Sequence, residues 1–120
     1  MGLDMYAYKT RTPMPAPGFE EPQDAVEIQY WRKHPDLHGW MEQLYRRKGG
    51  TAEFNCETVD LTPADIDALE EAVTQNLLPH TEGFFFGESR PEDKVLDLCF
   101  IRAARKAFAE GFAVFYTSWW

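Results

Sequence analysis

The last nine residues, 112–120, are the stretch that most constrains the fold. They read FAVFYTSWW and follow Gly111. Aromatic and β-branched residues favour extended backbone, so this density of them predicts a β-strand. Side chains alternate across a strand, and here both faces carry large apolar groups. A strand of this kind is expected inside a sheet, with other parts of the chain packed on both sides.

Three further segments have the alternation or composition of strands: residues 3–9, 26–33 and 54–61. The first two are separated by residues 10–24, which contain four prolines. Proline cannot donate a backbone hydrogen bond and blocks helix, so these residues are predicted to form an extended arm. Phe19 is expected to pin this arm to the body.

Three segments have the apolar spacing of amphipathic helices. The first begins at Pro35 and stops at Gly49, and the second begins after a Thr62 cap and ends at Pro79. The third spans residues 91–110. The apolar stripes of the second and third helices are expected to be buried, and they include the following side chains: Leu77, Val95, Leu98 and Cys99.

These elements predict a single α+β domain over residues 1–120, with the proline-rich arm at 10–24. The sheet is expected to be mixed or antiparallel, with about four to five strands and three helices mostly on one face. A chain of 120 residues is long enough to bury one substantial core. No apolar run reaches the ~18 residues of a membrane span, and no secretory signal is recognisable. The cytoplasm is therefore the expected compartment, with reduced thiols.

The formal net charge of −8 and the pI of about 4.8 disfavour a general nucleic-acid binder. Such a protein presents a basic face to phosphates. An acidic surface keeps a protein soluble, and it also attracts a basic partner or imitates nucleic acid. Direct binding to nucleic acid or to a membrane is not expected.

Several short motifs together resemble a family of small bacteriophage and prophage proteins of unestablished function. The resemblance spans nearly the whole chain and rests on GLDMY (2–6), YWRK (30–33), HGW (38–40), NC (55–56), TEGFFFG (81–87) and FYTSWW (115–120). It implies a phage-related origin, action in the bacterial cytoplasm and an accessory or counter-defence role. The proline-rich arm is longer than this pattern leads one to expect.

The clearest candidate for metal binding is the pair His34 and His38, whose spacing places two imidazoles on one side of a helix. A third ligand would have to come from Cys56, Asp4 or His80. His34 precedes a proline and is expected to lie outside the helix. No metal and no other cofactor is therefore predicted.

Nucleophilic catalysis would need Cys56 or Ser118, with His38 as the general base. The sequence contains no nucleophile elbow, and no acid is placed behind His38. No catalytic residue is predicted, and a binding role is favoured over an enzymatic one.

The most suggestive group of residues sets polar side chains among aromatic rings. Arg and Lys beside Trp and Tyr can grip a planar or anionic ligand, or form a protein-binding patch. The candidate binding residues are Asp4, Tyr6, Trp31, Arg32, Lys33, His38, Trp40, Asn55, Tyr116, Ser118 and Trp119. The alternative is that the rings belong to the core.

The leading hypothesis is a phage-type accessory protein that binds a host protein without catalysis, for example as a counter-defence inhibitor. Its affinity would come from the tryptophans Trp31, Trp40, Trp119 and Trp120. One alternative is a pocket protein or small enzyme for a nucleotide-like metabolite, using Arg32, Lys33, His38 and Asn55. Another is a structural component of a virion.

Overall fold

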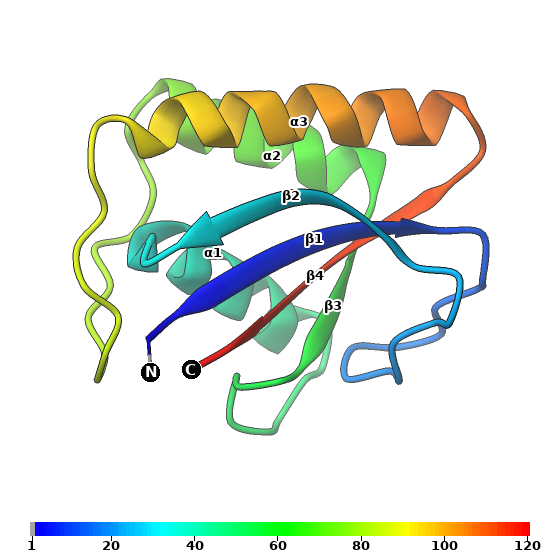
Figure 1. Ribbon diagram of the computed structural model, residues 1–120, viewed down its shortest axis with the longest axis horizontal. Helices are drawn as coiled ribbons and strands as arrows, with labels where there is room; N and C mark the ends of the chain where they lie inside the picture. Colours follow the sequence, from blue (N-terminus) through cyan, green and yellow to red (C-terminus); the bar gives the residue numbers. More distant parts are fainter. Residues whose placement is uncertain (1) are drawn as a thin grey trace.

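The computed structural model describes residues 2–120 and shows an antiparallel sheet with helices to one side of it (Figure 1). In chain order the elements are β1 (Asp4–Thr10), β2 (Val26–Arg32), α1 (Pro35–Arg47), β3 (Thr58–Leu61), α2 (Pro63–Thr74), α3 (Asp93–Ala109) and β4 (Ala113–Trp119). Four strands and three helices in one α+β unit confirm the predicted fold class.

The sheet has the strand order β2-β1-β4-β3, and all neighbouring strands are antiparallel. The C-terminal strand β4 therefore lies between β1 and β3, as its composition predicts. Residues 114–118 of β4 are buried, and only its end reaches solvent. At the end of the sheet where the two termini meet, Asp4 lies opposite Arg32 on β2 and opposite Trp119 on β4.

The core lies between the helices and one face of the sheet. Because side chains alternate, every second residue of β1 points to this face, and Met5 and Ala7 are fully buried there. On the neighbouring strand Trp31 packs edge-on against Phe100 of α3, with ring centroids 5.1 Å apart. Tyr116 of β4 faces α1 from the same side of the sheet.

The second helix starts as predicted but ends earlier. Thr62 and Asp65 form a capping box, and Pro63 occupies the first turn. The helix ends at Thr74 because Asn76 adopts a left-handed conformation, with φ 57°. The amide of Leu77 then donates to the carbonyl of Ala72, as in a Schellman C-cap. Leu77 consequently lies beyond the helix and is exposed, which corrects the prediction that it is buried.

The buried face of the third helix is rotated from the predicted one. Val95, Leu98 and Cys99 are exposed, whereas two carboxylates, Asp93 and Asp97, are buried. The carboxylates tolerate burial because they have buried polar partners, described below. The prediction failed because apolar spacing alone assigns acidic residues to the solvent face.

The third strand is shorter than the predicted 54–61. Cys56 has φ 62°, which interrupts the extended backbone. Before it, the side-chain amide of Asn55 replaces strand pairing: its Nδ2 donates to the carbonyl of Trp120, and its Oδ1 accepts the Trp120 amide. Residues 54–57 thus hold the end of β4 without forming a ladder.

The proline-rich arm runs along the β3 edge of the sheet. The amide of Gly18 donates to the carbonyl of Thr58 (2.8 Å), and the Thr58 hydroxyl donates to the carbonyl of Phe19 (2.7 Å). The ring of Phe19 packs edge-on against Phe115, with centroids 5.3 Å apart. The next outward carbonyl of β3, that of Asp60, accepts from Lys48. The β3 edge is therefore covered, while β2 forms the other edge of the sheet.

Candidate functional site

The structure divides the eleven predicted binding residues between several places. Five belong to the interior: Trp31, His38, Trp40, Tyr116 and Ser118. Four lie on the sheet face that points away from the helices: Asp4, Tyr6, Arg32 and Trp119. The remaining two serve local structure, since Lys33 forms the left-handed turn after β2 and Asn55 holds the C-terminal residue. The predicted cluster is therefore not a single site.

The outer sheet face carries a row of rings that we call the aromatic face, made of Tyr6, Tyr8, Tyr30 and Trp119. The rings of Tyr6 and Tyr30 lie 5.3 Å apart, and Tyr6 stacks on Tyr8 at 6.1 Å. The indole Nε1 of Trp119 donates to the Tyr6 hydroxyl at 3.4 Å. Trp119 is 56% exposed and Tyr30 is 39% exposed. No helix covers this face (Figure 1).

One end of the aromatic face is organised by Asp4. Its Oδ1 accepts hydrogen bonds from the Tyr30 hydroxyl at 2.6 Å and from Nη1 of Arg32 at 2.8 Å. Desolvation alone would raise the pKa of Asp4, but these two hydrogen bonds outweigh it and hold the pKa below its ordinary value. The bond to Asp4 in turn raises the pKa of Tyr30. Asp4 therefore stays ionised at neutral pH and fixes the Tyr30 ring.

Beside Trp119 the outer face is hollowed by a depression of about 330 Å³. Its lining residues are Tyr6, Tyr8, Glu21, Cys56, Thr117, Ser118 and Trp119. Glu21, from the arm, adds a carboxylate to this aromatic lining. The sequence analysis missed Tyr8 and Tyr30, although both occupy alternate strand positions that match those of Tyr6 and Arg32.

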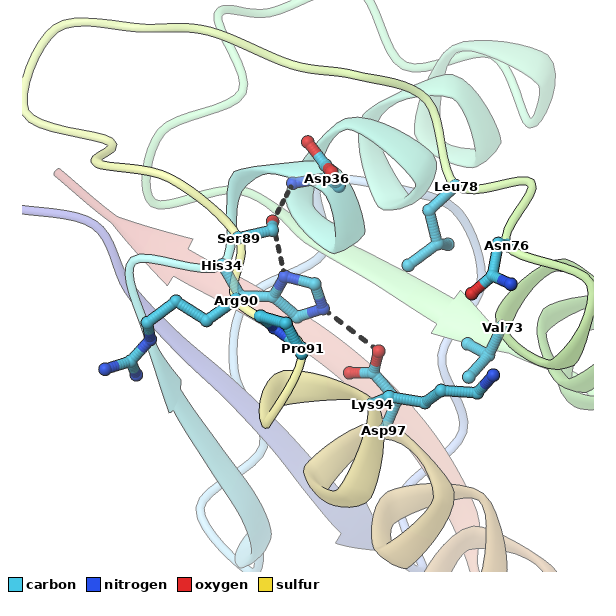
Figure 2. A pocket seen from close by; sticks show the side chains of 10 residues that line it. All are labelled: His34, Asp36, Val73, Asn76, Leu78, Ser89, Arg90, Pro91, Lys94 and Asp97. Atoms are coloured by element: carbon cyan, nitrogen blue, oxygen red, sulfur yellow. Dashed lines mark hydrogen bonds and ion pairs between the residues drawn. The ribbon is translucent and has the colours of Figure 1, made fainter.

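A second hollow, of about 420 Å³, lies where the β2–α1 junction meets the end of α2 and the start of α3 (Figure 2). Its lining residues are His34, Asp36, Val73, Asn76, Leu78, Ser89, Arg90, Pro91, Lys94 and Asp97. Its wall contains both apolar and charged side chains. We call it the His34 cavity.

The imidazole of His34 bonds on both sides. Its Nε2 lies 3.0 Å from Oδ2 of Asp97, whose Oδ1 accepts from the indole Nε1 of Trp31, also at 3.0 Å. Its Nδ1 lies 2.7 Å from Oγ of Ser89, and the same Oγ accepts the backbone amide of Asp36 at 3.0 Å. Figure 2 shows this continuous line of bonds from the α1 amide to the α3 carboxylate.

The structure separates the two histidines that the sequence pairs as metal ligands. His34 reaches Ser89 and Asp97, whereas Nδ1 of His38 lies 2.8 Å from the Tyr116 hydroxyl in the core. Within residues 2–120 no three His, Cys, Asp or Glu side chains are placed to hold a metal ion. Cys56 and Ser118 do not contact His38 in a way that would activate either of them.

Sequence reasoning missed Ser89 and Asp97. A signal was present for Asp97: Asp93 and Asp97 are four residues apart and continue in register with the buried Phe100 and Ile101. Two acids on an otherwise apolar helix face indicate a buried polar partner. For Ser89, in a loop of variable composition, the sequence offers no comparable signal.

Comparison with protein-family models, with curated proteins and with solved structures found no significant match. The resemblance to small phage proteins therefore stays a prediction from the sequence. None of the helices within residues 2–120 has both the length and the apolar character needed to cross a membrane.

Proposed function

We propose that the protein acts by binding a partner protein through the aromatic face of its sheet. The observation that carries this proposal is the exposure of Trp119, which leaves 56% of its surface in solvent although it belongs to a central strand. Trp and Tyr supply large contact areas with a polar tip, and they dominate the energetics of protein interfaces. Trp119 lies beside Tyr6, which in turn packs on Tyr30, and such a surface gains free energy when a partner covers it.

The charges around the aromatic face favour a basic partner segment. Glu21 lines the hollow beside Trp119, and the whole chain carries a net charge of −8. Besides burial, the negative charges of Glu21 and Glu27 raise the pKa of Tyr8, so both carboxylates lie near the rings. Arg or Lys side chains of a partner would lie over the rings and face these carboxylates. The same charge disfavours nucleic acid as the occupant.

Following the resemblance to phage proteins, we propose that the partner is a host protein in the bacterial cytoplasm. Binding would inhibit that host protein by covering a basic surface, as a counter-defence factor does. Trp31 and Trp40 make no contribution to such binding, since both are buried. Trp119 is the anchor, and the half-buried Trp120 supports the strand end through its bonds to Asn55.

A pocket for a nucleotide-like metabolite is less well supported. That alternative needs Arg32, Lys33, His38 and Asn55 to converge on one cavity. His38 is sealed in the core, Asn55 is occupied by the C-terminal residue, and Arg32 pairs with Asp4 on the outer face. No observation favours a structural role in a virion.

Site-specific photocrosslinking tests the proposal. The photoreactive residue p-benzoylphenylalanine replaces Trp119 in one sample and Glu71, an exposed residue of α2, in the control. In a bacterial lysate the position-119 sample should give a discrete adduct with a host protein that the position-71 sample does not give. Glu21→Lys should reduce this adduct several-fold, because it reverses the charge beside the rings.

Two results would count against the aromatic face. One is an identical set of adducts from positions 119 and 71, which would indicate nonspecific capture. The other is a specific adduct that is unchanged by Glu21→Lys and by added salt, because a charge-steered encounter weakens at high ionic strength.

A further inference from the structure

Three side chains from separate parts of the chain form a continuous relay in the wall of the His34 cavity (Figure 2). Ser89 comes from the loop before α3, His34 from the β2–α1 junction, and Asp97 from α3, with distances of 2.7 Å and 3.0 Å between successive members. A hydroxyl, an imidazole and a carboxylate in this order activate serine nucleophiles on unrelated folds. We propose that Ser89, His34 and Asp97 hydrolyse small esters through an acyl-serine intermediate.

The hydrogen-bond partners fix where the protons lie. An ionised carboxylate only accepts hydrogen bonds, so the Nε2 atom of His34 that faces Asp97 carries a proton. In a neutral imidazole the other nitrogen, Nδ1, is then a free acceptor, and it takes the hydrogen bond of the Ser89 hydroxyl. The Trp31 indole can only donate, so it holds the other oxygen of Asp97 in place. The imidazole is thus oriented as a base toward Ser89.

The surroundings of the relay match these roles. The side chains of His34 and Asp97 are 4% and 2% exposed, while Ser89 is half-buried at the cavity wall and can be reached by a substrate. The backbone amide of Asp36, in the first turn of α1, points at Oγ of Ser89 from 3.0 Å. The partial positive charge of the helix N-terminus favours negative charge on Oγ as its proton leaves for His34, and the amide holds Oγ in place.

The reaction balances without a cofactor. Oγ of Ser89 adds to the ester carbonyl carbon, and its proton moves to Nδ1 of His34. The bond from this carbon to the alcohol oxygen then breaks, and that oxygen takes the proton from Nδ1. A water molecule adds to the acyl carbon and gives its proton to Nδ1. The bond to Oγ breaks, Oγ takes the proton back, and the carboxylic acid leaves.

The imidazolium that forms during each step is flanked by two carboxylates. Oδ2 of Asp97 lies 3.0 Å from Nε2 of His34, and Oδ2 of Asp93 lies 3.6 Å from Nδ1. Asp93 is itself held by the backbone amide of Arg90 at 2.8 Å. Both carboxylates stabilise the charged ring more than the neutral one, which lowers the free energy of the charged intermediate.

The cavity lining identifies the class of substrate. Val73, Leu78 and Pro91 give it an apolar wall, and Lys94 adds a positive charge, whereas the guanidinium of Arg90 points away from the other lining groups (Figure 2). A volume of about 420 Å³ holds a small molecule, not a polypeptide. The substrate we infer is an ester with a short acyl chain, which packs on the apolar wall, and an anionic group, which faces Lys94.

Covalent labelling gives the most direct test, because the chain contains only two serines, Ser89 and Ser118. A fluorophosphonate reagent should phosphonylate Ser89 in the folded protein, as shown by peptide mass spectrometry. Ser118 is buried and serves as the internal reference in the same digest. Either of two results would overturn the proposal. One is that Ser89 is not labelled, and the other is that Ser89 is labelled at the same rate in urea-unfolded protein as in folded protein.

Hydrolysis of p-nitrophenyl acetate and butyrate gives the second test. We expect a burst of nitrophenol from the wild type and loss of the burst in Ser89→Ala. In Asp97→Asn the rate should fall at least about 100-fold. His80→Gln, which removes an exposed imidazole, is the control and should leave the rate unchanged.

A separate variant covers the case in which Ser89→Ala does not fold. Ser89→Cys keeps the side-chain shape and should form a thioester with the acyl group, detectable as a mass increase on that peptide. Two results together would overturn the proposal and give the relay a purely structural role. They are a folded Ser89→Cys protein that accumulates no thioester and a wild type that shows no burst.

Discussion

Nδ1 of His38 lies 2.8 Å from the hydroxyl oxygen of Tyr116, in the interior between α1 and β4. Both residues were candidates for a binding surface, and both are almost completely buried. Burial lowers the pKa of His38 to about 4 and raises the pKa of Tyr116. At neutral pH the two side chains are therefore uncharged, and they satisfy each other inside the core.

The buried His38 should make the protein sensitive to acid. In the unfolded chain its imidazole takes up a proton below a pH of about 6.5, whereas in the folded protein it stays neutral down to about pH 4. The unfolded state binds more protons in this window, so stability falls as the pH falls. This one group should cost about 3 kcal/mol once the pH is below both values. Urea unfolding at pH 7 and at pH 4 measures the loss.

His38→Gln is the matched variant for this measurement. It removes the titrating group, so the loss of stability between pH 7 and pH 4 should be smaller than in the wild type by about 3 kcal/mol. The carboxylates titrate in both proteins and cancel in the comparison. An equal loss in the two proteins would show that His38 does not have the low folded-state pKa.

Removing the hydroxyl of Tyr116 should destabilise the fold without changing its shape. Tyr116→Phe leaves Nδ1 of His38 buried and without its partner, at a cost of about 1–3 kcal/mol in the free energy of unfolding. Tyr6→Phe makes the same chemical change on the outer face, where water replaces the lost bond, and should cost less than about 0.5 kcal/mol. Urea denaturation compares the two, and equal effects would contradict the assigned burial.

Replacing a tryptophan by phenylalanine should have unequal effects on the two faces of the sheet. Trp31→Phe deletes the N–H that holds Asp97 and leaves a buried carboxylate oxygen unsatisfied, so we expect a loss of about 2–3 kcal/mol. Trp119→Phe should cost less than about 0.5 kcal/mol, because the indole is exposed. Thermal and urea unfolding of both variants checks the difference, and a large loss for Trp119→Phe would place that ring in the core.

The close approach of α1 to the loop before α3 depends on Gly39. A Cβ added there would lie 1.9 Å from Oγ1 of Thr81 and 2.9 Å from its Cβ. Gly39→Ala should therefore push the loop away, with a loss of about 2–3 kcal/mol and faster proteolysis of the loop.

The double variant Gly39→Ala/Thr81→Gly tests whether this overlap is the cause. Removing the Thr81 side chain frees the space, so the double variant should be more stable than the sum of the single changes predicts. Additive losses, measured by urea unfolding, would mean that Gly39 is needed for another reason.

Local sequence signals predicted much of the fold. The alternation in residues 112–120 identified the central strand, and Thr62-Pro63 identified the start of α2, because both signals depend only on neighbouring residues. The end of α2 was placed at Pro79, yet the left-handed Asn76 ends it earlier. Asparagine adopts that conformation only in some contexts, so an asparagine in the sequence predicts a helix end less strongly than a glycine does.

The candidate sites were harder to predict for a physical reason. Alternation shows that Tyr6 and Met5 lie on opposite faces of β1, but only the packing of the helices decides which face is covered. Trp31 and Trp119 both lie in predicted strands among other aromatic residues, yet Trp31 is buried and Trp119 is exposed. The His34 cavity joins residues more than 50 positions apart, such as His34 and Ser89, and no local pattern reports such a meeting.

The outward carbonyl oxygens of Thr58 and Asp60 accept hydrogen bonds from the amide of Gly18 and from Nζ of Lys48, so these two acceptors are not available to a neighbouring chain. On the opposite margin no strand of the sheet pairs with the outward side of β2. A second molecule would therefore add more readily to β2 than to β3. The occupied carbonyls of β3 work against continued strand-by-strand growth into fibrils.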